Sequence, residues 1–114
     1  MSDFEHRLME AADRVKQVET AYYRAVTEWE EAKMNCAIRE AELIECGKIN
    51  MKNPDTRNAD LWKYAKEERK MVRIKETKVD SLKSELHYRQ SVLNILLVSA
   101  KLHGGVESKC LEQS

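Results

Sequence analysis

The sequence predicts an all-α fold in which one long antiparallel helical hairpin forms a coiled coil and assembles into an oligomeric helical bundle. Apolar residues recur at alternating spacings of four and three along both halves of the chain. This heptad spacing keeps one stripe of a helix facing a partner helix. Only three glycines and one proline occur in 114 residues, and 35% of the residues are charged. That composition is typical of long helices, and one domain is expected over residues 1–105.

A capping motif predicts that the first helix begins near residue 3, and the heptads extend it to about residue 46. The Ser2 hydroxyl can accept a hydrogen bond from the backbone amide of Glu5, while the Glu5 side chain can reach back to the Ser2 amide. The positions that follow share the heptad spacing, and among them only Arg39 is costly to bury. They are Phe4, Leu8, Ala11, Val15, Val18, Tyr22, Ala25, Trp29, Ala32, Cys36, Arg39, Leu43 and Cys46.

Residues 47–53 are predicted to form the turn of the hairpin. Gly47 can adopt the left-handed conformation that closes a helix. Asn53 is a good N-cap, and Pro54 suits the first helical position because its missing backbone donor is not needed there. A second helix is therefore expected over residues 54–103.

The second helix repeats the heptad spacing, so the two helices can pair along their stripes. If Arg39 faces Glu68, the antiparallel register pairs residues whose numbers sum to about 107. The first 50 residues hold 7 Lys and Arg against 11 Asp and Glu, and the rest hold 13 against 9, which also favours antiparallel pairing. Gly104 and Gly105 are expected to end this helix and to leave residues 106–114 as a flexible tail.

The end of the second helix is apolar almost all the way round, and one facing helix covers only a single stripe of such a segment. A second contact is therefore predicted there. Its occupant is either a further copy of the chain, in a homo-oligomer, or a different protein. The expected interface residues are Leu93, Leu96, Leu97, Val98 and Leu102.

The residues that could carry chemistry form no recognised catalytic or metal-binding pattern. Cys36, Cys46 and Cys110 lie far apart, without the spacing of a metal site or a disulfide framework. His6 and His103 could meet at the open end of the hairpin, but two histidines alone hold a metal weakly. We therefore expect no enzymatic activity, no metal and no cofactor. The odd number of thiols and the short apolar runs favour a cytoplasmic protein that does not enter the membrane.

Basic residues gather around the turn, where they could bind the phosphates of a nucleotide or of nucleic acid. Asparagine amides could add contacts there, and Trp62 or Tyr64 offers a face for stacking. The same residues could instead form a solvated helix face, since Lys63 and Glu67 have the i,i+4 spacing of an ordinary surface pair. The candidate ligand residues are Lys48, Asn50, Lys52, Asn53, Arg57, Lys63, Lys66, Arg69, Lys70 and Arg73.

The turn motif from Gly47 to Asn53, of the form GKI-x-x-KN, and the heptads from Val79 to Leu102 resemble small helical-hairpin proteins encoded by bacteriophages. The resemblance implies a non-enzymatic counter-defence protein in the host cytoplasm. Such a protein inhibits host immunity by binding a defence protein or by sequestering an anionic nucleotide signal. Two alternatives stay open: a nucleic-acid-binding accessory factor that uses the basic turn region, and a purely structural coiled-coil scaffold.

Overall fold

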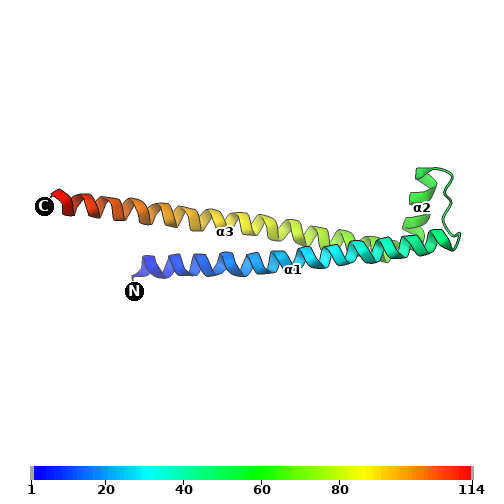
Figure 1. Ribbon diagram of the computed structural model, residues 1–114, viewed down its shortest axis with the longest axis horizontal. Coiled ribbons are helices and arrows are strands. Elements are labelled where there is room, and N and C mark those ends of the chain that lie inside the picture. Colours follow the sequence, from blue (N-terminus) through cyan, green and yellow to red (C-terminus); the bar gives the residue numbers. More distant parts are fainter. Residues whose placement is uncertain (1, 114) are drawn as a thin grey trace. The chain divides into compact units, whose positions relative to one another are not determined.

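The protein is helical throughout most of its length. The computed structural model describes the backbone of residues 2–113 and the side chains of residues 2–102. Within that part the helices are α1 (Asp3–Glu45), α2 (Pro54–Tyr64) and α3 (Lys66–Gln113), and no strand occurs (Figure 1). The predicted all-α fold is thereby confirmed.

The two long helices contribute to two compact units. Unit 1 combines the chain up to Tyr22 with the chain from Leu82 onward, and unit 2 comprises Tyr23–Ser81. Within each unit a segment of α1 lies beside a segment of α3 that runs in the opposite direction (Figure 1). Each unit is thus an antiparallel helix pair, and unit 2 also contains the turn and α2.

The heptad stripe is the contact surface between the paired helices. In unit 2 the stripe residues Ala25, Ala32, Cys36 and Leu43 of α1 are buried, as is Val79 of α3. Unit 1 follows the same stripe with less complete burial. There, Val18 is buried, and the half-buried positions include Leu8, Ala11, Val15, Leu82, Leu86, Leu93 and Leu96.

The predicted register is confirmed by a contact across the stripe in unit 2. The Arg39 Nε atom lies 3.9 Å from the Glu68 Oε1 atom. Glu40 and Arg69, the next residues along each helix, form a much shorter ion pair of 2.6 Å. The residue numbers of both pairs sum to nearly the same value, which is the mark of antiparallel pairing.

Both ends of α1 follow their local sequence signals. The Ser2 Oγ atom accepts a hydrogen bond of 3.1 Å from the Glu5 amide. At the other end Gly47 has φ +73°, and the amides of Gly47 and Lys48 donate to the carbonyls of Ile44 and Leu43 at 3.1 Å each. These two bonds form a Schellman motif, for which a residue with left-handed dihedrals is required.

The second helix is not continuous, and here the prediction is wrong. It is divided at Ala65, which has φ −114° and ψ 28° and is fully buried. As a result α2 stands at a steep angle to the adjoining part of α3 (Figure 1). The bend brings Leu61 and Ala65 into a buried cluster with Leu43 and Ile49. The free energy gained by burying Ile49 of the turn and Leu61 of α2 offsets the cost of interrupting the helix.

The C-terminal boundary also differs from the expected one. The helix was expected to end at Gly104 and Gly105, but α3 continues to Gln113. A glycine lowers helix stability by about 1 kcal/mol relative to alanine but can adopt helical dihedrals without strain. Side chains from residue 103 onward, including His103 and Cys110, lie outside those that the structure describes.

The buried cluster at the turn should set the stability of unit 2. Leu43 is 2% exposed, whereas the adjacent Ile44 is 40% exposed. Replacing Leu43 with Ala removes buried methyl groups and leaves a cavity, so we expect a loss of about 2–4 kcal/mol in the free energy of unfolding. Ile44→Ala is the matched control and should cost less than about 0.5 kcal/mol. Equal losses in urea denaturation would show that the cluster does not hold the turn.

Candidate functional site

The basic turn region of unit 2 is built around two aromatic rings of α2. The guanidinium groups of Arg69 and Arg73 lie 5.4 and 4.7 Å from the ring centroid of Trp62. The ammonium groups of Lys48 and Lys63 lie 5.8 and 5.1 Å from that of Tyr64. Cations over aromatic rings gain about 0.5–1 kcal/mol at exposed sites. Four of the ten predicted ligand residues are therefore ordered by contacts with rings.

Arg69 has a structural role that the sequence did not indicate. Its Nε atom donates a hydrogen bond of 2.6 Å to the Glu40 Oε1 atom, and the two side chains are only 19% and 25% exposed. The ion pair links α3 to α1, while the same guanidinium covers the ring of Trp62 on α2. Since Arg69 already neutralises Glu40, it contributes less than an exposed cation to attraction of a distant anion.

The two asparagines of the predicted site hold the turn itself. The Asn50 Oδ1 atom accepts a hydrogen bond of 3.0 Å from the backbone amide of Lys52. The backbone amide of Asn50 donates a bond of 2.7 Å to the Asp60 Oδ2 atom. Asn53 caps α2, because its Oδ1 atom accepts a 2.9 Å bond from the Thr56 amide. Their carbonyl oxygens thus act within the protein, and a ligand contact through their NH2 groups stays a prediction.

The remaining charges form an exposed basic surface. Within residues 48–73 eight Lys and Arg stand against four Asp and Glu, an excess of four positive charges. Seven of these basic side chains are exposed and lie on the turn, on α2 and on the first turns of α3. They are Lys48, Lys52, Arg57, Lys63, Lys66, Lys70 and Arg73. An ordered turn that carries such an excess attracts anions and lowers the entropic cost of binding them.

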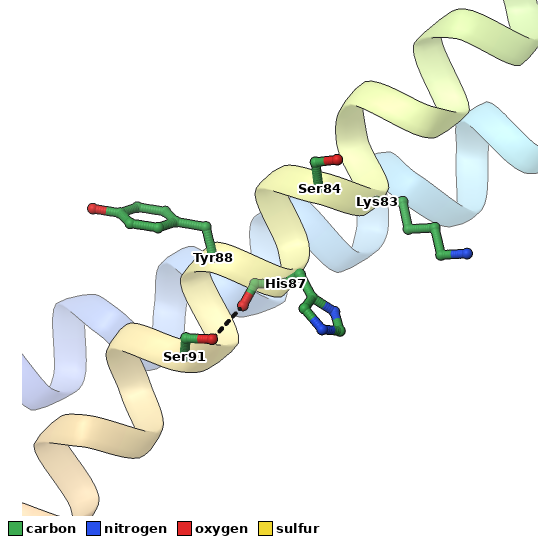
Figure 2. Close-up of a pocket in the computed structure, with 5 residues that line it drawn as sticks. All are labelled: Lys83, Ser84, His87, Tyr88 and Ser91. Atoms are coloured by element: carbon green, nitrogen blue, oxygen red, sulfur yellow. Dashed lines mark hydrogen bonds between the residues drawn. The ribbon is translucent and has the colours of Figure 1, made fainter.

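Three shallow depressions on the described surface lie apart from these cations. One shallow depression in unit 2 is lined by Ala32, Asn35, Glu67, Glu68 and Met71. Another, in unit 1, lies on α3 and is lined by Lys83, Ser84, His87, Tyr88 and Ser91 (Figure 2). A third, also in unit 1, lies between α1 and α3 and includes Arg7, Arg14 and Arg89. None of these three depressions contains a predicted ligand residue.

The predicted interface residues divide between two faces of α3 in unit 1. Leu93 and Leu96 belong to the stripe that faces α1 and are half-buried. Leu97, Val98 and Leu102 are 46%, 55% and 67% exposed. Two further apolar residues that the interface prediction omitted, Tyr88 and Ile95, are 60% and 65% exposed. Their spacing of seven was the signal in the sequence that could have identified them.

The part of the chain that the structure describes contains neither a metal-binding cluster nor a membrane-spanning helix. Its His, Cys, Asp and Glu side chains include no group of three or more that could hold a metal ion. Over the same residues, no helix combines the length and the apolar character that crossing a membrane requires. Comparison of the chain with protein-family models, curated proteins and solved structures finds no match.

The two described thiols should differ in reactivity. Cys36 is buried in the stripe and donates a hydrogen bond of 3.6 Å to the Glu40 Oε1 atom, whereas Cys46 is exposed. Burial, and then the negative charge of Glu40, raise the pKa of the Cys36 thiol. Because the thiolate is the reactive form, iodoacetamide near pH 8 should label Cys46 at least about tenfold faster. Peptide mass spectrometry measures both rates, and equal rates would contradict the burial of Cys36.

Glu28 of α1 should make the stability of unit 2 depend on pH. Its Oε2 atom lies 3.1 and 3.7 Å from the Nζ atoms of Lys75 and Lys78 on α3. The hydrogen bond and charge of Lys75, and then the charge of Lys78, lower the pKa of Glu28 from its ordinary value of 4.5. The resulting stabilisation is present above that value and is lost as the pH falls through the lowered pKa.

The test is Glu28→Gln, with Glu31→Gln as the control, since Glu31 is an exposed carboxylate of the same helix. At pH 7 the first change should lower the midpoint of thermal unfolding and the second should have little effect. The difference between Glu28→Gln and the unaltered protein should shrink as the pH falls below 4.5 and through the lowered pKa, where Glu28 of the folded protein becomes protonated. A difference that stays constant down to pH 3 would show that these ion pairs do not stabilise unit 2.

Proposed function

We propose that the protein is a non-enzymatic inhibitor that covers an acidic surface of a target protein with its basic turn region. In the phage-type setting that the sequence resembles, the target is a host defence protein. The observation that carries the proposal is the ordered group of exposed cations around Trp62 and Tyr64 on α2. Positive charge of this kind raises the rate of association with an acidic partner and selects against basic ones.

The distribution of the cations favours a macromolecular surface over a small nucleotide. Sites for small ligands are usually concave and enclose most of the ligand. The exposed cations instead extend over the turn, α2 and the start of α3, and the depression described in unit 2 is lined by Glu67 and Glu68. A carboxylate-rich surface can contact several separated cations at once, whereas one nucleotide reaches only a few.

The aromatic rings also favour a protein target over a nucleic acid. Non-specific binding of single strands relies on bases that stack on exposed aromatic faces. Arg69 and Arg73 already lie over Trp62, and Lys48 and Lys63 lie over Tyr64. A base would have to compete with these cations for the rings, while carboxylates can bind the same cations without displacing them.

The test reverses two exposed charges, in Lys66→Glu combined with Lys70→Glu. The matched control is Lys16→Glu with Arg24→Glu, which makes the same change in net charge on exposed positions of α1. Hosts that carry defence systems are challenged with phage while expressing each variant. The unaltered chain and the control should restore plating. The Lys66/Lys70 variant should restore it at least about tenfold less, because two attractive charges become repulsive toward an acidic target. A tenfold loss of affinity requires only about 1.4 kcal/mol.

Calorimetric titration with cyclic nucleotides and with a short DNA strand completes the experiment. Neither probe should bind in the micromolar range. If a nucleotide binds at a fixed stoichiometry and the Lys66/Lys70 change abolishes that binding, the function is nucleotide sequestration and the proposed blockade of a protein target is wrong. If the DNA strand binds with an affinity that falls steeply as the salt concentration rises, the function is nucleic-acid binding and the proposed blockade is again wrong. Full anti-defence activity of the Lys66/Lys70 variant would show that the basic region is only a solvated face.

A further inference from the structure

A second row of residues with heptad spacing runs along α3 in unit 1, on the side away from α1. We call these residues the outer stripe; they are Ser84, Tyr88, Ser91, Ile95, Val98 and Leu102. Each lies two positions after a residue of the stripe that faces α1, and two residues turn an α-helix by about 200°. All six are exposed, with Ile95 at 65% and Leu102 at 67%.

The outer stripe carries no charge, although 35% of the residues of the chain are charged. Alternating spacings of four and three place its members on one line of a gently supercoiled helix, which is the geometry of a contact with another helix. In the sequence the same spacing continues backward through Ile74, Thr77 and Ser81, which are also uncharged. A helix face that contacts only solvent does not require uncharged residues at heptad spacing.

The residues that line the depression in Figure 2 have the spacing of a site that receives a side chain from a partner helix. Four of its lining residues, Ser84, His87, Tyr88 and Ser91, are spaced i, i+3, i+4 and i+7. This is the set of four that receives one side chain in knobs-into-holes packing. The Ser91 hydroxyl donates a hydrogen bond of 3.0 Å to the His87 carbonyl (Figure 2). Its donor is therefore already satisfied, and burying Ser91 leaves no unpaired hydroxyl hydrogen.

The sizes of the six residues fit a second copy of the same helix in the antiparallel direction. The first half of the stripe contains both serines, and the second half is entirely aliphatic. With the halves exchanged, Ser84 faces Leu102 of the second copy, and Ser91 faces Ile95 of the second copy. Both of these contacts pair a small residue with a large one, which fills space evenly, and the third contact pairs Tyr88 with Val98. A parallel arrangement would instead place serine on serine.

The exposed apolar side chains of the outer stripe also favour a second copy. Tyr88, Ile95, Val98 and Leu102 are 60%, 65%, 55% and 67% exposed. A row of exposed apolar side chains is typical of a surface that a partner covers. A self-complementary stripe satisfies the two-fold symmetry that most homodimers have.

We propose that the outer stripe of α3 binds the outer stripe of a second copy in the antiparallel direction, with Ser84–Ser91 of each chain against Ile95–Leu102 of the other. The contact involves unit 1 alone, so it stands or fails independently of the basic turn region in unit 2.

The first test is Ile95→Glu, which places a charge in the contact without altering the stripe that faces α1. Met9→Glu is the matched control, because Met9 is an apolar residue of unit 1 that is 53% exposed and lies on α1. Sedimentation equilibrium should show a dimer for the unaltered chain and for Met9→Glu. Ile95→Glu should raise the dissociation constant at least about 100-fold, since both symmetric contacts acquire an unpaired charge, and circular dichroism should show unchanged helix content.

Disulfide cross-linking tests the direction of pairing and does not depend on a destabilised variant. Chains with Ser91→Cys are mixed with chains with Ile95→Cys and oxidised, and peptide mass spectrometry identifies the linked pairs. The mixed 91–95 link should form at least about tenfold faster than the 91–91 link, since disulfides require closely placed Cβ atoms. Preferential 91–91 linkage would overturn the antiparallel arrangement. A monomer at tens of micromolar, or a dimer unaffected by Ile95→Glu, would overturn the proposal altogether.

Discussion

Burial of apolar residues along the stripe between α1 and α3 is the contact on which the rest of each unit depends, and in unit 2 most of these residues are small. Ala25, Ala32 and Cys36 of α1 are buried there, as is Val79 of α3. A pair of helices has little interior, and no large side chain among the described residues is completely buried. Stability must therefore come from many partly buried contacts along the whole stripe.

Charge has two separate uses in unit 2. Some ion pairs lie across the stripe, as between Arg69 and Glu40 or between Lys75 and Glu28, and they fix how the helices align. Such half-buried pairs add specificity more than stability, because desolvation offsets much of their attraction. The lysines at the turn and on α2 lie outside this framework. They supply the electrostatic attraction that the proposed inhibitory role requires.

The two units differ in the surfaces that they expose. In unit 2 the bend at Ala65 turns α2 away from α3 and sets Trp62 beside Arg69 and Arg73. In unit 1 the helices stay regular, and α3 has one apolar stripe toward α1 and another, the outer stripe, toward solvent. Self-association through unit 1 would join two chains, each with its own basic region, and two linked copies favour binding to a multivalent target.

The sequence by itself determined the helical class, the stripe, the first cap and the alignment of Arg39 with Glu68, because these follow from local spacing and short-range hydrogen bonds. The break at Ala65 was decided by tertiary structure alone. Leu61, Ala65 and Glu68 keep the heptad spacing through it, and only the burial of Ile49 against Leu43 makes the bend favourable. Similarly, the sequence located the basic residues, but the pairing of Arg69 with Glu40 joins positions 29 residues apart. The heptad spacing aligns this part of the two helices, but the choice of Glu40 as the partner of Arg69 depends on how the side chains lie once the helices are packed together.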